Sequence, residues 1–383
     1  MSETDMRQRP KGQWWQSTEP MVEVSHDAVR RLGLAALIKA GASPADAEFL
    51  LAIPLDKAVQ GDHARGLEAL PPMVRAAIQG DISLQPSLEI LRETASTALV
   101  DGDPKVVRSL ICRGAMDLAI AKARSTGVAW VGVRYPATIL TAHLQQAVDA
   151  GMIGMVMTQC YPVVAPHGGF QPMLGNGPIG FGIPAGAHDP IIFDASMTQT
   201  SASGVKLAAA QGEQVPEGFL LDAHGEPTTD ASAFPAAGHL GHGAQLASGT
   251  LLPIGGSHKT YGLIFIISLL SAVLADSEAP WAAGEIIGGS PGDPAKRYGS
   301  TYMALDPAAF LAADEFRRRV DAFIDGLKAS PTKAGVDEIL YPGELSQRLK
   351  RERKAAGRFL LPETHYRELL KLGEELGLNE ALT

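Results

Sequence analysis

The sequence has few cysteines and no excess of basic residues. Only two cysteines, Cys112 and Cys160, occur in 383 residues, and both lie in apolar segments. We therefore expect no disulfide framework, and two isolated thiols fit a reducing cytoplasm. The formal net charge of −9 at pH 7 argues against nucleic acid and anionic membranes as partners.

Long apolar runs are also missing. The longest, Gly262–Ala275, contains two serines and is too short to span a bilayer, so it predicts a buried helix and no membrane span. Residues 1–20 are polar and lack the apolar core of a secretory signal, and we expect them to be disordered.

Several motifs of nucleotide, metal and nucleophile sites are absent as well. No Walker-type loop occurs, and no GxGxxG opens a helix after a predicted strand. The ten histidines form neither HxH nor HExxH, so no metal site is predicted. Gly288–Gly292 fits Gly-x-Ser-x-Gly, but a proline follows the serine inside a long loop, which does not suit a nucleophile elbow.

The most distinctive feature is a Gly/Pro-rich loop, residues 165–178, between two apolar runs, Met152–Met157 and Ile179–Pro184. The loop contains four glycines and three prolines. Glycine lets the backbone approach a ligand closely, and proline fixes the local path of the chain. A stiff loop between two buried strands is therefore a candidate binding site for a small molecule.

The pattern of apolar residues divides the chain into two parts. Helical periodicity dominates the first eighty residues, where Ser43-Pro-Ala-Asp46 has the form of a helix start. Short strands and helices then alternate, a polar Gly-rich tract covers residues 211–256, and helices return near the C-terminus. We expect a helical lobe of residues 21–85 plus 310–383, and a cofactor- and substrate-binding domain of residues 86–309.

An ordered set of motifs resembles the type-2 malate/L-lactate dehydrogenase family, which also includes sulfolactate, ureidoglycolate and diketogulonate dehydrogenases and a cyclic-imine reductase. The matching segments cover roughly residues 25–380 in family order: Gly61–Leu67, Gly127–Arg134, Val164–Pro178, Asp194–Thr198, Pro216–Asp222, Leu252–Leu263 and Tyr341–Glu344.

The resemblance implies an α/β (α+β) fold with a largely antiparallel central sheet, surrounding helices and a separate helical lobe, and not a Rossmann fold. It also implies a homodimer with active sites near the subunit interface. The implied reaction interconverts a small 2-hydroxy acid and its 2-oxo acid, or reduces a cyclic imino acid, with NAD or NADP as cofactor and a small carboxylate as substrate.

The first candidate site residues precede Leu70-Pro71. Counting back from this pair, Arg65 takes the position of the family's catalytic histidine, and Ala69 that of a family arginine. His63 lies two residues before Arg65. An imidazole that titrates near neutrality suits proton transfer to a carbonyl oxygen, so His63 is the candidate acid–base residue. Arg65 is a candidate clamp for the substrate carboxylate. A solvent-exposed side chain is the alternative for both.

Two further candidates lie on the substrate side. Arg134 ends the predicted strand Val128–Val133 and matches a family arginine, with a capping or solvated role as the alternative. Thr138 stands where the resemblance places a second active-site histidine, and we assign it to substrate binding. His143, one helical turn further, is a less favoured substitute for that histidine.

The resemblance assigns other residues to the cofactor. Gly175, Asn176, Gly177 and Pro178 replace a pocket-lining Gly-Thr-Asn-Pro motif, with a structural turn as the alternative. Asp194 begins a region like the family's Asp-x-Ala-Thr-Ser and is a candidate catalytic residue, with a helix N-cap as the alternative. The remaining cofactor candidates are Ser196, Thr198 and Lys259.

Two hypotheses of function follow. The first is an NAD(P)-dependent oxidoreductase, and the second is a divergent member that has lost hydride transfer and acts as a binding protein or a non-redox enzyme. The second is motivated by substitutions at functional positions of the family: Arg65, Ala69, Thr138, Asn176-Gly177, and Gly204 in place of a lysine, with Lys206 displaced from it. The ordered motifs favour the first.

Overall fold

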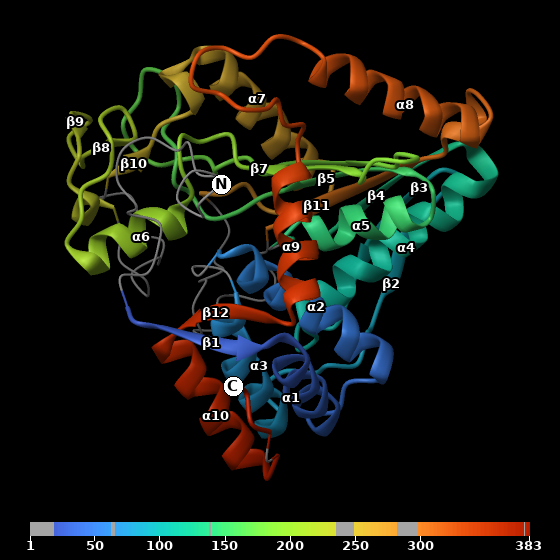
Figure 1. Cartoon of the computed structure of the whole chain (residues 1–383). Coiled ribbons are helices and arrows are strands. Elements are labelled where there is room, and N and C mark those ends of the chain that lie inside the picture. The colour runs from blue at the N-terminus through green and yellow to red at the C-terminus, as the bar shows by residue number, and fades with distance from the viewer. Residues whose placement is uncertain (1–18, 63–65, 138, 235–248, 282–297, 379) are drawn as a thin grey trace.

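The structure is a computed structural model that describes residues 19–62, 66–137, 139–234, 249–281, 298–378 and 380–383. A seven-stranded sheet forms the centre of the larger part of the molecule (Figure 1). Its strands, in spatial order, are β2 (Glu89–Glu93), β3 (Thr97–Asp101), β4 (Val128–Val133), β11 (Ser300–Leu305), β5 (Ile153–Thr158), β6 (Ile179–Ile183) and β7 (Ile191–Ala195).

The sheet is largely antiparallel. Only the pairing of β3 with β4 is parallel, and β2·β3, β4·β11, β11·β5, β5·β6 and β6·β7 are antiparallel. A Rossmann fold requires a mostly parallel sheet with helices on both faces. The fold expected from the sequence is therefore confirmed.

Helices cover one face of the sheet over its central strands, and the other face is more open. Strand residues alternate between the two faces, and Val131, Val156 and Tyr302 are buried beneath helices α4 (Arg108–Thr126) and α5 (Thr141–Asp149). The opposite face carries Trp130 and Met303, which are only partly buried. Figure 1 shows α7 (His258–Ser268) and α8 (Ala313–Lys328) on this second side.

The apolar run that includes α7 is helical, as expected, but the expectation that it is buried is wrong for this chain. The helix continues from α7 into a π-helical turn at Leu269–Val273. Ile264 and Ile267 are buried, whereas Phe265, Ile266, Leu269 and Val273 are between 40% and 66% exposed. The segment is apolar all round, and only one side of it packs against the rest of the chain.

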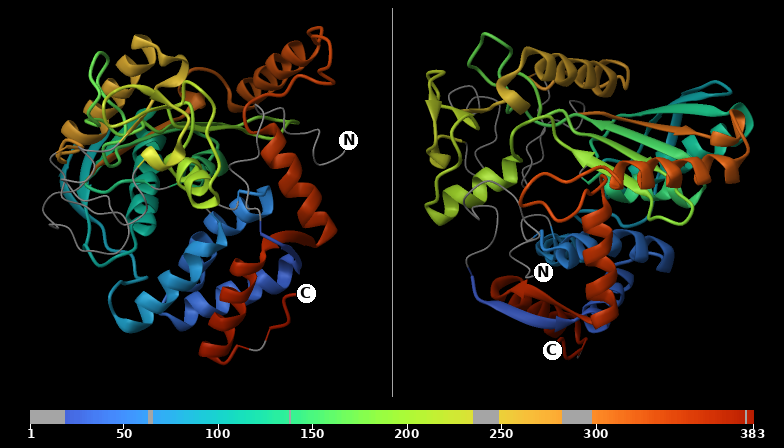
Figure 2. Two further views of the ribbon diagram at one scale, coloured as in Figure 1. Left: turned by 90° about the vertical axis from the view of Figure 1, so that its left-hand side faces the viewer. Right: turned by 45° about the horizontal axis from the view of Figure 1, so that its top comes forward.

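A second lobe contains helices from both ends of the chain (Figure 2). It is built from β1 (Met21–Ser25), α1 (His26–Lys39), α2 (Pro44–Gln60), α3 (Leu70–Gln79), β12 (Arg358–Pro362) and α10 (Glu363–Leu376). Ser43 caps α2 by accepting the N–H of Asp46 at 3.2 Å, and Pro44 occupies the first helical position, as the sequence predicts. The domain boundaries given above remain a proposal.

Helix α8, which those boundaries assign to the helical lobe, contacts the loop between β6 and β7. Its Asp321 accepts the N–H groups of residues 186–188.

The polar tract expected over residues 211–256 contains a small sheet that the sequence did not predict. Strands β8 (Leu220–Leu221), β9 (Pro227–Thr228) and β10 (Thr250–Leu251) pair in the order β10-β8-β9 next to helix α6 (Ala202–Gln211). A second hydrophobic core holds this region to the Gly/Pro-rich loop and to α7. Its members include Val164, Leu174, Val205, Leu220, Leu251 and Ile264.

Candidate active site

Candidate residues from several segments lie at one end of the central sheet. Strands β3, β4, β5 and β7 run in the same direction, and β6 and β11 run in the opposite one. Arg134 therefore follows β4, and Gln159 follows β5, at the end where Pro178 precedes β6 and Asp194 nears the end of β7. The register supports this arrangement, since Ile179 pairs with Ala195.

The structure does not bring Arg134 to Asp194. Strands β4 and β7 are separated by β11, β5 and β6, which places the two residues about 19 Å apart because neighbouring strands lie ~4.8 Å from each other. The guanidinium of Arg134 also forms an ion pair with Asp101 at 3.4 Å. A small acid cannot contact both Arg134 and Asp194.

Asp194 lines a cavity of about 600 Å³ between the two lobes. The cavity lies between α2, α5, β7 and helix α9 (Glu344–Ala356). Its apolar wall includes Phe49, Ile53, Ile139, Ile192 and Phe193. Its polar groups include Asp56, Lys57, Gln145, Asp149, Asp194 and Lys350.

The side chain of Asp194 contacts the start of α5 and does not cap a helix. The Thr141 hydroxyl donates to Asp194 Oδ2 at 2.9 Å. The helix that follows Asp194 in sequence, α6, is capped by Ser201, which accepts the N–H of Gly204 at 3.1 Å. The N-cap alternative for Asp194 is therefore not what the structure shows.

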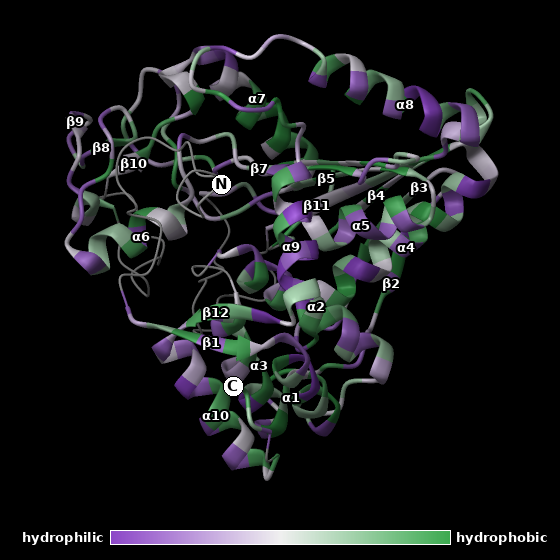
Figure 3. Ribbon diagram, viewed as in Figure 1, coloured by the Kyte–Doolittle hydropathy of each residue, from purple (hydrophilic) through white to green (hydrophobic). Residues whose placement is uncertain are grey.

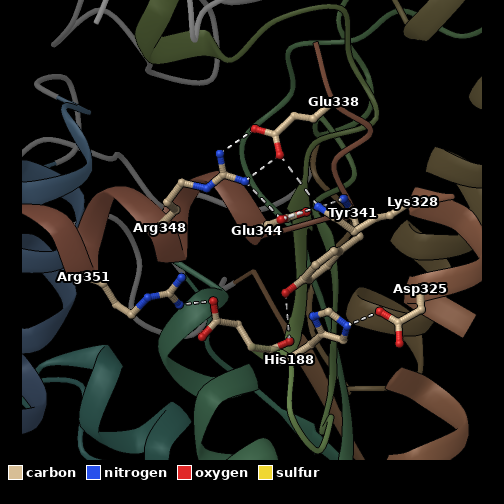
Figure 4. Close-up of polar contacts among 9 residues, drawn as sticks. His188, Asp325, Lys328, Glu338, Tyr341, Glu344, Arg348 and Arg351 are labelled. Atoms are coloured by element: carbon tan, nitrogen blue, oxygen red, sulfur yellow. Dashed lines mark hydrogen bonds and ion pairs between the residues drawn. The ribbon is translucent and has the colours of Figure 1, made fainter. Parts of the chain in front are cut away.

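The motif Tyr341–Glu344 positions α9 against the cavity. Pro342 O accepts the N–H of Ile192 at 3.3 Å, which covers the free edge of β7. Gly343 has φ +90°, and a Cβ there would lie 2.7 Å from Ile192 O, so glycine is required at this close approach. Glu344 accepts the N–H of Tyr341 at 3.2 Å and binds Arg348 at 3.1 Å (Figure 4).

Helix α9 is mostly hydrophilic (Figure 3) and presents Ser346, Gln347 and Lys350 to the cavity. Arg351 forms an ion pair with Asp189, and Lys350 forms one with Asp56 at 2.5 Å. Ion pairs therefore attach this hydrophilic helix both to the sheet side and to α2. These ion pairs hold α9 in place as a polar wall beside Asp194, although none of the residues of α9 is buried.

The candidate cofactor loops contact each other directly. Met197 N donates to Asn176 O at 2.9 Å, and Thr158 N donates to Pro178 O at 3.2 Å. Gly177 has φ +56°, a conformation that side chains rarely adopt. A Cβ on Gly175 would lie 2.8 Å from Gln159 Oε1. The structure thus places the 175–178 and 194–198 segments side by side.

The other cofactor candidates differ in what they offer to a ligand. Thr198 is buried, and its hydroxyl donates to Thr200 O at 2.7 Å, which is a structural bond. Ser196 Oγ lies 3.1 Å from Thr198 Oγ1 and is only partly buried. Lys259 is exposed in the first turn of α7. Its neighbour His258 lies 6.0 Å, ring to ring, from His167 of the Gly/Pro-rich loop.

His143 does not suit the role of a substitute proton donor. It is buried, and its ring meets Tyr302 edge-on at 5.4 Å between centroids. Burial lowers the pKa of His143 to about 4, so the imidazole is neutral at pH 7. Its Nδ1 lies 3.2 Å from Gln146 Oε1.

Sequence reasoning missed a polar cluster beside Asn176. Cys160 Sγ donates to Asn176 Oδ1 at 2.9 Å, and Lys206 Nζ lies 3.4 Å from Tyr161 Oη. Burial raises the pKa of Cys160 to about 12, so the thiol is no nucleophile at neutral pH. The signal was present in the sequence, because Gln159-Cys160-Tyr161 directly follows an apolar run that predicts a buried strand.

His63, Arg65 and Thr138 lie outside the described residues, and their roles stay predictions. Residues near them adjoin the site: Gln60 lines the cavity, and Ala137 N donates to Thr158 Oγ1 at 2.9 Å. Among the described residues, no group of three or more His, Cys, Asp or Glu side chains is placed to hold a metal ion. None of the helices in the described ranges is long and apolar enough to cross a membrane.

The fold and the site define a two-lobed α+β protein outside the Rossmann class, with an interlobe cavity at the end of an antiparallel sheet. The model of the malate/L-lactate dehydrogenase family matches residues 24–370. The chain belongs to this family, in its type-2 group.

Individual relatives agree with this assignment. The L-sulfolactate dehydrogenase of Methanothermobacter thermautotrophicus is 35% identical over 332 residues, 85% of this chain and 89% of the relative. The Delta(1)-pyrroline-2-carboxylate/Delta(1)-piperideine-2-carboxylate reductase of Pseudomonas putida is 28% identical over 342 residues, 89% of this chain and 93% of the relative. The structure of sulfolactate dehydrogenase from Methanocaldococcus jannaschii has a TM-score of 0.77 and 29% identity, and the match covers 94% of this chain and 98% of that one.

The family and these relatives are oxidoreductases, and so is this protein. The comparisons favour the first hypothesis drawn from the sequence over a protein that has lost hydride transfer.

Proposed function

We propose that the protein uses NAD(H) or NADP(H) to interconvert a small 2-hydroxy acid and its 2-oxo acid, or to reduce a cyclic imino acid. The observation that carries the proposal is the position of Asp194. This residue lines the interlobe cavity and begins the segment whose Met197 is hydrogen-bonded to Asn176. One continuous stretch of chain therefore joins a cavity of about 600 Å³ to the Gly/Pro-rich loop.

The residues present fit a nicotinamide dinucleotide. Phe49 and Phe193 give the cavity apolar walls, while Asp149 offers a carboxylate to ribose hydroxyls. We propose that the cavity, Ser196 and the 175–178 loop would together hold the cofactor. When bound, the nicotinamide supplies or accepts the hydride.

The chain's own residues bind the acid and move the proton. We retain His63 as the proposed acid–base residue, with Arg65 and Thr138 as proposed substrate contacts, because Gln60 and Ala137 adjoin the site. Arg134 suits this role poorly, since it is paired with Asp101 and lies far from Asp194. Asp194 is proposed to orient the reacting groups from its bond with Thr141.

We further propose a homodimer, which would cover the exposed apolar surface. Phe265, Ile266, Leu269 and Val273 of the α7 segment are exposed, and Trp130 and other residues of the open sheet face are only partly buried. A contiguous apolar patch on a soluble enzyme is typical of a subunit interface. The free thiols of Cys112 and Cys160 are consistent with a reducing cytoplasm as the proposed location.

Binding and turnover test the proposed function. The purified protein is titrated with NADH and with NADPH by fluorescence, and oxidation of the tighter-binding nucleotide is then followed with a panel of 2-oxo acids and cyclic imino acids. Binding of either nucleotide and turnover of at least one acid are the expected results. If neither nucleotide binds, the proposal is wrong.

A further inference from the structure

Lys206 forms no ion pair with any carboxylate in the described part of the chain. Its ammonium lies 3.4 Å from Tyr161 Oη and 5.2 Å from the centroid of that ring. No ion pair of Lys206 with a described carboxylate occurs, although the side chain is partly buried. Burial lowers the pKa of Lys206, because the ammonium has lost water without gaining a counter-ion.

Gln159, two residues before Tyr161 in the sequence, offers a second donor without an acceptor. The residue is fully buried, and its Nε2 has no hydrogen-bond partner among the described residues. Its Oε1 is already engaged, since it accepts the N–H of Cys160 at 3.3 Å. A buried donor without a partner destabilises the folded protein, so its presence requires an explanation, and a ligand is one.

Both donors are connected to the Gly/Pro-rich loop through the segment from Gln159 to Tyr161. Gln159 and Tyr161, which contacts Lys206, flank Cys160, and Cys160 binds the side chain of Asn176 at 2.9 Å. Gly175 stands against both Gln159 and Cys160, where a Cβ would approach Gln159 Oε1 and Cys160 Sγ within 3.0 Å. Glycine at this position lets the loop backbone approach Gln159 and Cys160 closely.

We propose that Lys206 and Gln159 form the subsite that binds the carboxylate of the substrate, with Lys206 as the charged contact. The inference rests on the proposed function and adds to it the residues that select an acid over a neutral carbonyl compound. An ammonium and an amide N–H together supply charge-assisted and neutral hydrogen bonds to the two oxygens of one carboxylate. Tyr161 holds the ammonium in place through its ring and hydroxyl.

A substrate carboxylate and a phosphate of the cofactor are both anions that an ammonium and an amide N–H bind, and we assign this subsite to the carboxylate. Hydrogen bonds connect the segment after Asp194 to Asn176, and Asn176 to Cys160, so the subsite adjoins the loops proposed to hold the cofactor. The experiment below separates the two anions, because only a contact with the substrate carboxylate distinguishes an acid from its ester.

Calorimetric titration with oxamate, a carboxylate that resembles a 2-oxo acid, tests the subsite in the presence and absence of NADH or NADPH. The proteins are wild type, Lys206→Met, Lys206→Arg and Gln159→Met, with Lys333→Met as the matched control because Lys333 is exposed in the loop after α8. Thermal melting verifies that each variant folds. The same set is assayed with pyruvate and its uncharged methyl ester.

We expect Lys206→Met to weaken oxamate binding roughly 10- to 100-fold, the range for loss of a hydrogen bond to a charged group. Lys206→Arg retains most of the affinity, Gln159→Met loses less than Lys206→Met, and Lys333→Met matches wild type. The preference for pyruvate over its methyl ester falls in Lys206→Met, while the affinity for the nucleotide stays within about twofold.

Other outcomes overturn the inference. Unchanged oxamate binding in Lys206→Met, or no binding of oxamate to wild type, removes Lys206 from the substrate. A weakened affinity for the nucleotide with an unchanged acid-to-ester preference assigns Lys206 to a cofactor phosphate instead. Should wild type bind neither nucleotide, the proposed function fails, and the oxamate titration without nucleotide still decides whether this subsite exists.

Discussion

The backbone N–H of Met197 donates to the carbonyl oxygen of Asn176 at 2.9 Å. This bond joins the segment 194–198 to the loop 175–178. Both segments are cofactor-binding candidates in the sequence, but the sequence does not show that they touch. The side chain of Asn176 is in turn held by Cys160. The bond therefore links the interlobe cavity to the buried polar cluster.

Substitution of Asp194 tests its proposed role at the junction of cavity and loop. We expect Asp194→Asn to lower kcat/KM by about 100-fold, a factor typical of a residue that assists proton transfer or orientation. Thr141→Val removes only the hydroxyl that donates to Asp194, and we expect a loss of a few fold. Steady-state kinetics with the best acid found gives both values, and equal effects of the two variants would contradict a role for the charge.

The close approach of Gly343 to β7 predicts a large effect on stability. Gly343→Ala places a Cβ 2.7 Å from Ile192 O at φ +90° and is expected to cost about 3 kcal/mol or more in free energy of unfolding. Gly357→Ala is the control, because Gly357 also has positive φ but open space around it, and about 1 kcal/mol is expected. Urea unfolding measures both, and equal losses would show that the contact with Ile192 does not matter.

The exposed apolar side of the α7 segment predicts the state of association. Ile266→Glu with Val273→Glu places two charges on this surface and is expected to convert the proposed dimer to monomers. Ile78→Glu, on the exposed side of α3, is the control and should leave the mass unchanged. Light scattering after size-exclusion chromatography reads the mass. A monomeric wild type, or a dimeric double variant, would refute this interface.

His143 predicts a loss of stability in acid. Burial lowers its pKa in the folded protein to about 4, below the ordinary value of 6.5. Between these values the unfolded chain binds a proton that the folded protein excludes, so stability falls as pH decreases from 6.5 to 4. From pH 7 to pH 5 this group alone removes about 2 kcal/mol.

His143→Phe keeps a ring between Phe49 and Tyr302 and does not titrate. Urea unfolding at pH 7 and pH 5 should therefore show a smaller difference between the two pH values in this variant than in wild type. The same difference in both proteins would mean that His143 is protonated in the folded state.

The largely antiparallel fold could be expected because an ordered set of motifs resembles a known family, and single strands and helix caps could be predicted because their signals are local. The strands after residues 128 and 179 and the cap at Ser43 formed where the sequence placed them. The small sheet of β8, β9 and β10 was missed, since each strand has only two residues and owes its position to tertiary packing. The sequence predicts that the α7 segment is buried, yet much of it is exposed. An apolar run does not show whether the same chain or a second subunit covers it.

The candidate site was predicted in part. The neighbouring positions of Asn176 and Asp194 follow from motifs and are reproduced as contacts between their segments. The separation of Arg134 from Asp194 depends on strand order, which places β11, β5 and β6 between them and which sequence spacing cannot supply. Sequence spacing displaces Lys206 from the family's lysine position, and only the contact of its ammonium with Tyr161 indicates a role.

The most direct test of the central claim is the transfer of label from a nicotinamide that carries deuterium at its transferable position. The protein is incubated with deuterated NADH or NADPH and a panel of 2-oxo acids, and the products are examined by mass spectrometry. The account predicts one deuterium on the carbinol carbon of a 2-hydroxy acid, or on the corresponding ring carbon when a cyclic imino acid is the substrate. No labelled product with either nucleotide and any of these acids would contradict it.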